Sequence, residues 1–225
     1  MILRFKYKKY GPVIYIGHLD VMRTFQKIIR RSGIDASYTG GFSPHLKLSF
    51  AQPLSVGVET DGDYFDLEMN SLPDMKNLVK LMNSQCVEGI EVVSATILDD
   101  DAQNGMSSVK AAKYLFEYSG GLDSKKRILS EFFAKESYVF EHEIKGEKKT
   151  RDIMPDIYSY EYIDDKTISV MVNCSSGGNL KAFVVSDALN HFGLDCELIK
   201  YKRLDLYTEI NCEYVELSKL GEVYD

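Results

Sequence analysis

The chain has 225 residues, enough for one sizeable core or two small ones, and its 44% hydrophobic and 27% charged residues are ordinary for a folded globular protein. Its net charge of −7 conceals an asymmetry, because residues 1–50 sum to +7 and the other 175 to −14. No apolar run is long enough to span a membrane, and the N-terminus does not resemble a signal peptide. We therefore expect a cytoplasmic protein with no membrane segment, whose basic end meets an anionic partner.

The first 98 residues predict six elements in chain order. Residues 2–9 alternate as a strand, and 13–16 extend again after a Gly-Pro turn. The spacing of apolar residues predicts a helix over 18–32, two short extended pieces at 36–38 and 47–50, a half-buried strand at 63–69, a helix after Pro73 and a strand at 90–98. This strand–helix–strand–strand–helix–strand order is that of a ferredoxin-like module.

The remaining residues repeat this order after a polar, turn-rich segment. Residues 99–108 are expected to be a linker. Beyond it, the pattern predicts a strand at 112–118, a helix at 123–134, a strand at 138–144, an extended region at 157–172, a helix at 179–192 and a strand at 196–207. The predicted fold class is thus α+β, with two tandem ferredoxin-like (βαββαβ) modules at 1–98 and 109–225; one larger α+β domain is the alternative.

The helix predicted at 18–32 separates two kinds of residue. At 100° per residue, an apolar group falls on one side and a basic group of four, Arg23, Lys27, Arg30 and Arg31, falls on the other. Four cations on one face repel each other unless an anion offsets them, so the face indicates phosphate contact; a solvated face is the plain alternative.

Two histidines are candidate chemical groups. At the helix start, Gly17 is expected to be the N-cap and Asp20 the acid of a capping box. His18 is expected to be a neutral imidazole at the helix N-terminus, with the role of a ligand, a proton carrier or a core residue. His45 follows two glycines in a loop rich in polar groups. The loop residues that suit an anion or a stacked base are Gly41, Phe42, Ser43, His45 and Lys47.

Several other site types lack the required pattern. His18, Asp20 and His45 have no spacing specific to a metal site, so no metal is predicted. Four scattered cysteines without a Cys-x-x-Cys pair predict free thiols. Nucleophile-elbow and glycine-rich phosphate patterns are absent from the sequence. A second basic segment, expected to be a hairpin, contains Lys145, Lys148, Lys149 and Arg151, and Asn179 is the expected N-cap of a later helix.

Several of these segments resemble the radical SAM-linked proteins, a family of unknown function whose members are fused to, or encoded beside, cobalamin-binding radical SAM proteins. The resemblance is dense over residues 2–68 and rests on the segments 17–23, 30–33, 41–51 and 53–59. It is thinner later, at 151–155 and 178–181. Gly17 replaces the usual Ser, which removes a side-chain cap, and Leu46 replaces the usual Pro, which loosens the loop.

The resemblance implies an accessory protein of a radical SAM enzyme. The iron–sulfur cluster and S-adenosylmethionine would then belong to the partner, with no cofactor in this chain. Together with the basic residues, it favours a module that binds RNA or a nucleotide through Arg23, Lys27, Arg30, Arg31, the 41–47 loop and Arg151. The alternatives are an RNA-processing enzyme with His18 or His45 as general acid or base, and a protein-interaction scaffold that binds no nucleic acid.

Overall fold

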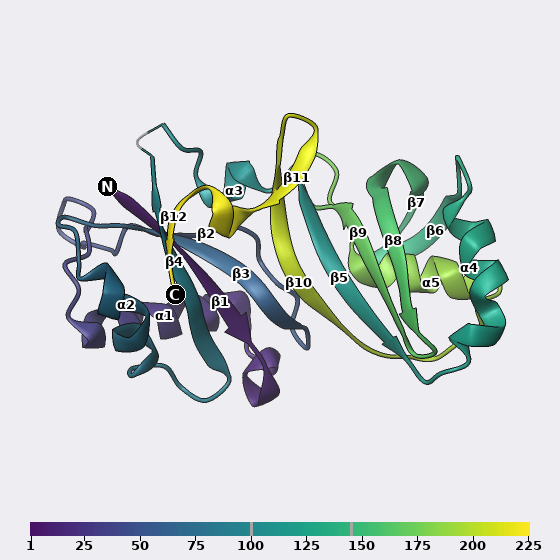
Figure 1. Cartoon of the computed structure of the whole chain (residues 1–225), viewed down its shortest axis with the longest axis horizontal. Helices are drawn as coiled ribbons and strands as arrows, with labels where there is room; N and C mark the ends of the chain where they lie inside the picture. Colours follow the sequence, from purple (N-terminus) through teal and green to yellow (C-terminus); the bar gives the residue numbers. More distant parts are fainter. Residues whose placement is uncertain (100, 145) are drawn as a thin grey trace. The chain divides into compact units, whose positions relative to one another are not determined.

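The computed structural model describes residues 1–99, 101–144 and 146–225, which form two compact units (Figure 1). Unit 1 comprises residues 1–109 and 203–225, and unit 2 comprises residues 110–202. The sequence placed 203–225 in the second module, but these residues pack with unit 1. The reason is long-range pairing: Arg203 and Asp205 bind Asp63 and Lys6 of the first segment.

Unit 1 contains the element order expected for residues 1–98. These elements are β1 (Ile2–Lys9), α1 (His18–Ser32), β2 (Leu48–Phe50), β3 (Glu59–Glu68), α2 (Met75–Asn83) and β4 (Ile90–Leu98). Further short elements were not predicted, namely η1 (Gly11–Tyr15), α3 (Gly105–Ser108), β11 (Glu213–Glu216), η4 (Leu217–Lys219) and β12 (Gly221–Tyr224). Thus residues 13–16 fall largely in a 3-10 helix rather than an extended segment, and the expected linker carries a helical turn; Asp100 of that linker lies outside the described residues.

The sheet of unit 1 is antiparallel in its described pairings. β1 lies between β4 and β3, β2 pairs with β3, and β12 pairs with β4. The end of β10 (Leu198–Ile210) also pairs with β3. Leu3 faces Leu67 and Phe5 faces Phe65 across the β1–β3 pair, and these residues share one core with the apolar sides of α1 and α2.

Strand β3 is buried on both faces, whereas the sequence predicted one exposed face. Tyr64 and Asp66, expected to point to solvent, are 1% and 5% exposed. Each is covered by a segment distant in sequence: Tyr64 donates a hydrogen bond to Asp205 of β10, and Asp66 accepts one from the backbone N–H of Gly105 in α3. The alternation of polar and apolar residues along β3 could not predict that distant segments cover its second face.

Unit 2 contains the remaining elements. These are β5 (Ala111–Tyr118), η2 (Leu122–Lys125), α4 (Lys126–Phe133), β6 (Val139–Ile144), β7 (Glu147–Asp152), η3 (Met154–Asp156), β8 (Ile157–Asp164), β9 (Thr167–Asn173), α5 (Ala182–Phe192) and the first residues of β10. The extended region predicted at 157–172 is therefore the hairpin β8–β9. The expected N-cap at Asn179 is wrong: Lys181 is the N-cap of α5, because Leu180 N–H binds the carbonyl of Asn173 and holds the preceding turn against β9.

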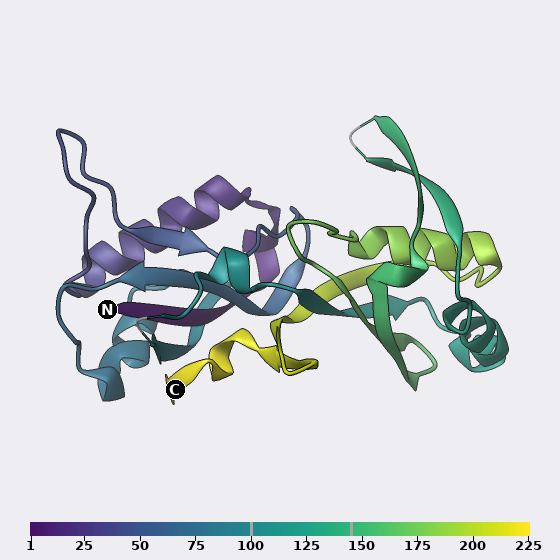
Figure 2. The ribbon, with the colours of Figure 1, turned by 90° about the horizontal axis from the view of Figure 1, so that it is seen from above.

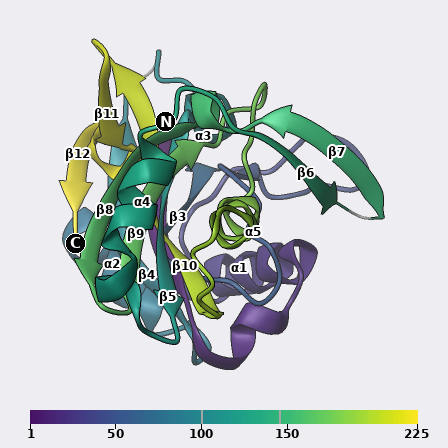
Figure 3. The ribbon, with the colours of Figure 1, turned by 90° about the vertical axis from the view of Figure 1, so that its right-hand side faces the viewer.

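The sheet of unit 2 has the order β10-β5-β9-β8, with β5–β9 and β9–β8 antiparallel. The predicted basic hairpin is present as β6–β7, a separate two-stranded sheet that projects from the rest of the unit (Figures 2 and 3). Its Lys145 lies outside the described residues. The chain is thus a mixed α+β protein. Of the helices within the described ranges, none combines the length and apolar character needed to cross a membrane.

Candidate functional site

Helix α1 divides its faces as predicted. Val21, Phe25, Ile28 and Ile29 are buried in the core of unit 1. The helix begins after Gly17 without a side-chain cap and ends at Gly33, whose φ of 66° allows the left-handed C-cap. The expected capping box is not the arrangement found: the Asp20 carboxylate accepts a hydrogen bond from Arg23 Nη1 at 3.0 Å, because Arg23 lies one turn further along the same face.

The four basic residues of α1 are all exposed, but only Arg23 has a carboxylate partner. Lys27, Arg30 and Arg31 form no ion pair with any residue that the structure describes. Arg30 and Arg31 lie in the last turn, where the helix dipole favours positive charge. That effect accounts for two cations at the helix end, but it does not account for Lys27 one turn earlier.

Three other cations of the N-terminal segment have carboxylate partners. Arg4 binds Asp66 through two hydrogen bonds of 2.8 and 3.0 Å, and both side chains are buried. Lys6 binds Asp205 at 2.5 Å, and Lys47 binds Glu68 at 2.7 Å on the surface. Three of the nine basic residues of segment 1–50 are therefore paired with acidic residues beyond residue 50.

The segment between α1 and β2 forms a projecting loop. A bridge between Tyr38 and Leu46 closes it, and Thr39 and His45 exchange backbone and hydroxyl hydrogen bonds at its base. Residues 39–45 are exposed, and Phe42 is fully exposed. The loop rises at the C-terminal end of α1 (Figure 2). We refer to Lys27, Arg30, Arg31, Phe42 and His45 as the α1–loop surface.

The two candidate histidines have different surroundings. His18 packs edge-on against Phe50, with ring centroids 5.3 Å apart. Partial burial lowers the pKa of His18, an effect that Asp63 opposes, so the fold favours the neutral imidazole. His45 is exposed on the loop. No contact between the two histidines exists within the described part of the chain, so a joint role is not supported.

A buried polar cluster near the start of α1 was not predicted. Asp63 accepts hydrogen bonds from Arg203 Nε at 2.6 Å and from Thr60 at 2.9 Å. Burial raises the pKa of Tyr7, which donates to Asp63, and lowers the pKa of the neighbouring Lys9. Arg203 and Asp63 are far apart in sequence, and no local pattern connects them.

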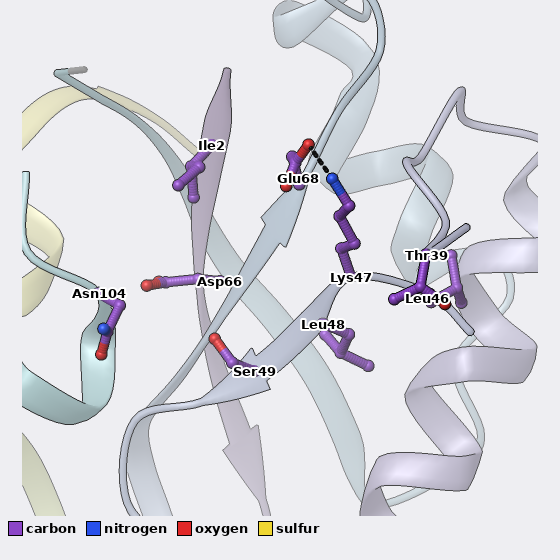
Figure 4. A pocket seen from close by; sticks show the side chains of 9 residues that line it. All are labelled: Ile2, Thr39, Leu46, Lys47, Leu48, Ser49, Asp66, Glu68 and Asn104. Carbon is purple, nitrogen blue, oxygen red and sulfur yellow. Dashed lines mark hydrogen bonds and ion pairs between the residues drawn. The ribbon is translucent and has the colours of Figure 1, made fainter. Parts of the chain in front are cut away.

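Unit 1 also contains a pocket of about 390 Å³. It lies beside β2 and the end of β3, and its lining residues are Ile2, Thr39, Leu46, Lys47, Leu48, Ser49, Asp66, Glu68 and Asn104 (Figure 4). Only Lys47 of this set was a predicted site residue. The complete lining comes from four separate segments, and no local sequence pattern connects these segments.

Arg151, the remaining predicted site residue, belongs to unit 2. It forms an ion pair with Asp156, which in turn accepts a hydrogen bond from Asn173 Nδ2 at 2.7 Å. This arrangement fastens the end of β7 to the end of β9. Gly178 packs on the same amide, where an added Cβ would come within 2.5 Å of Asn173 Nδ2.

Metal-binding groups are not brought together. Within the described ranges, no three His, Cys, Asp or Glu side chains are placed so that they could hold a metal ion. His18, Asp20 and His45 do not form such a group. The four cysteines, Cys86, Cys174, Cys196 and Cys212, are free thiols.

The chain belongs to the DUF2344 family, described as an uncharacterized protein conserved in bacteria, whose model matches residues 3–182. Among curated proteins, no sequence matches it. The family match does not connect the chain to radical SAM proteins, so that connection stays a prediction.

Chains in two solved protein complexes are similar to this chain. A chain of a Cbf5–Nop10–Gar1 complex gives a TM-score of 0.45 at 13% identity, over 90% of this chain and 49% of that one. A chain of the archaeal box H/ACA sRNP Nop10–Cbf5 complex gives a TM-score of 0.38 at 14% identity, and the match covers 88% of this chain and 46% of that one. This chain therefore spans about half the length of the chains it matches. Similarity at these TM-scores defines neither a shared fold nor a shared function.

Proposed function

We propose that this chain is a cytoplasmic accessory protein that binds single-stranded RNA through the α1–loop surface. The observation that supports it most strongly is the contrast among the N-terminal cations. Arg4, Lys6 and Lys47 have carboxylate partners, whereas Lys27, Arg30 and Arg31 are exposed and have none among the described residues.

The spacing of the three exposed cations makes an external anion favourable. Lys27 lies three and four residues before Arg30 and Arg31, so like charges are neighbours on the helix surface and destabilise it slightly. A phosphate backbone would remove this repulsion and release counterions. Phe42 and His45 on the loop offer flat rings on which unpaired bases can stack.

The partner and the fold family are part of the same proposal. The resemblance to radical SAM-linked proteins favours a radical SAM enzyme as the protein partner, with the cluster and S-adenosylmethionine on that enzyme. Strand order favours ferredoxin-like modules: unit 1 has β4-β1-β3-β2, and unit 2 has β10-β5-β9-β8 with the β6–β7 hairpin inserted.

The test is RNA binding as a function of salt, with Lys27, Arg30 and Arg31 replaced together by Gln. Each lost phosphate contact should lower the slope of log K against log salt by about 0.7 for a single strand, so the triple variant should lose about 2. The matched control replaces Lys76 and Lys80 by Gln, because these are exposed lysines of α2 in the same unit. Equal losses in both variants, or no binding by the natural protein, would refute the proposal and direct attention to a protein scaffold.

One observation favours the enzyme alternative enough to test it. His18 packs against Phe50, and its pKa is lowered by burial while the charges of Asp63 and Lys9 act on it, which is the kind of setting in which an imidazole can transfer protons. If the chain cleaves RNA, replacing His18 by Gln should abolish cleavage while leaving binding intact. If the natural protein cleaves no RNA, the binding function stands alone.

A further inference from the structure

The pocket beside β2 and β3 has a rigid polar wall. Asp66 is fixed by Arg4 on one side and by the Gly105 N–H, at 2.6 Å, on another. Arg4 also donates to the carbonyl of Gln103 at 3.0 Å, which holds the segment before α3 against the sheet. Asn104 is held by its role as N-cap of α3, where its Oδ1 accepts from Ser107 N–H at 3.0 Å. These side chains therefore keep their positions without a ligand.

Several hydrogen-bonding groups of the pocket remain available. Asn104 uses its oxygen as a cap, so its amide NH₂ is free to donate. The Ser49 hydroxyl has no hydrogen-bond partner among the described residues, and the Glu68 carboxylate uses one oxygen for Lys47. In Figure 4 the Asp66 carboxylate and the Ser49 hydroxyl point into the same space, and Asn104 lies across it from Asp66. Donors and acceptors thus line one region.

Three of the lining residues are aliphatic. Ile2, Leu46 and Leu48 contribute hydrocarbon side chains. A flat ring could lie against these groups while its edge meets the polar wall. The volume of about 390 Å³ is within the range of ordinary ligand pockets, which begins at about 300 Å³.

The charges of the pocket favour a neutral ligand. Lys47 is balanced by Glu68, and Asp66 is balanced by Arg4, one of whose nitrogens, Nη1, is buried without a partner within the described chain. No cation is left over for a phosphate group. A neutral ring that carries both N–H donors and acceptor nitrogens or oxygens matches the wall better, and carboxylates are good acceptors for an exocyclic amine.

We propose that this pocket binds one unpaired nucleobase that carries an exocyclic amino group. The proposal rests on the proposed function, because Thr39 and Leu46 link the pocket to the base of the loop that carries Phe42 and His45. Phosphates would contact the cations of α1, and the base at the loop would enter the pocket. Carboxylate acceptors favour adenine and cytosine over uracil, which has no amino group.

Two measurements test the proposal. Isotope-labelled methyl groups of Ile2, Leu46 and Leu48 should shift in NMR spectra when adenosine or cytidine is added, and should shift much less with uridine. Single-stranded oligo(A) or oligo(C) should bind about tenfold more tightly than oligo(U) of equal length, as expected for about 1.4 kcal/mol of base discrimination. Unchanged methyl signals at millimolar adenosine and cytidine would overturn the proposal.

Variants separate the pocket from the basic surface. Ser49→Phe fills the pocket from an exposed position and should remove the base preference, and Ser55→Phe is the matched control at another exposed serine of unit 1. Ser49→Phe should leave the salt slope unchanged, whereas the α1 triple variant should lower the slope and keep the base preference. RNA binding without base preference would refute the pocket alone. Nucleoside-induced methyl shifts without RNA binding would refute the proposed function alone.

Discussion

Strand β1 and helix α1 carry cations of the same kind in opposite environments. Arg4 of β1 is 1% exposed and bonded on both nitrogens that face Asp66, whereas Arg30 and Arg31 of α1 are exposed and unpaired within the described chain. A buried charge must have its partner nearby, because water is not available to solvate it. An exposed charge has no such requirement and stays free to bind an external anion. The N-terminal charge excess thus contains a structural part and a part available for binding.

The largest expected effect is loss of stability when Arg4 is replaced by Ala. Asp66 would be left as a buried carboxylate without its counterion, at a cost of about 3–5 kcal/mol in the free energy of unfolding. Urea denaturation measures the change. The matched control, Arg30→Ala on α1, should change stability by less than about 0.5 kcal/mol because Arg30 is exposed.

A double variant sharpens this prediction. Replacing Arg4 and Asp66 together by Leu removes the unpaired charge, and it should recover part of the loss seen in Arg4→Ala. Some cost should persist, because the N–H of Gly105 would lose its partner and the carbonyl of Gln103 would keep only its bond from Ser108. A double variant less stable than Arg4→Ala would mean that the unpaired charge of Asp66 is not the main cause of the loss of stability.

Lys6→Met should have an intermediate effect of about 2 kcal/mol, since Asp205 keeps its hydrogen bonds from Tyr64 and the Leu206 N–H. Burial raises the pKa of Asp205, and Lys6 opposes this rise. When an acid has a higher pKa in the folded protein than in the unfolded chain, the protein becomes less stable as pH increases from the unfolded to the folded pKa value. Lys6→Met should therefore lower the free energy of unfolding more at pH 7 than near pH 4, and unfolding curves at the two pH values measure the difference. An equal penalty at both would contradict this role of Lys6.

The smallest expected effect concerns His18. Burial lowers its pKa, so protonation is easier in the unfolded chain than in the folded one. The contribution of His18 to the free energy of unfolding should be complete above the ordinary histidine pKa of about 6.5, and it should decline as pH falls below that value. Because the side chain is partly solvated, the change should be below about 0.5 kcal/mol. Thermal unfolding of His18→Gln should lack this part of the pH dependence, and an unchanged profile would exclude His18 as its source.

The positions of the elements followed from the sequence where the pattern was local. The faces of α1 and its end at residue 32 were predicted from apolar spacing, and both are observed. The capping box at Asp20 and the N-cap at Asn179 were wrong, because contacts with Arg23 and with the end of β9 compete for the same groups. Of the candidate site, the basic face and the loop were identified, but the pocket and the Asp63 cluster were not.

By itself, the sequence determined the α+β class, the element order of the first 98 residues, the amphipathic face of α1 and the loop at 41–47 with its polar and aromatic groups. These features depend on neighbours within a few residues, so periodicity and turn chemistry reveal them. Only the tertiary structure decided that residues 203–225 complete unit 1, that Arg4 and Lys6 are occupied, and which cations stay free. Their partners lie 62 and 199 residues away, and a pairing at that distance is chosen by the fold and not by the local pattern.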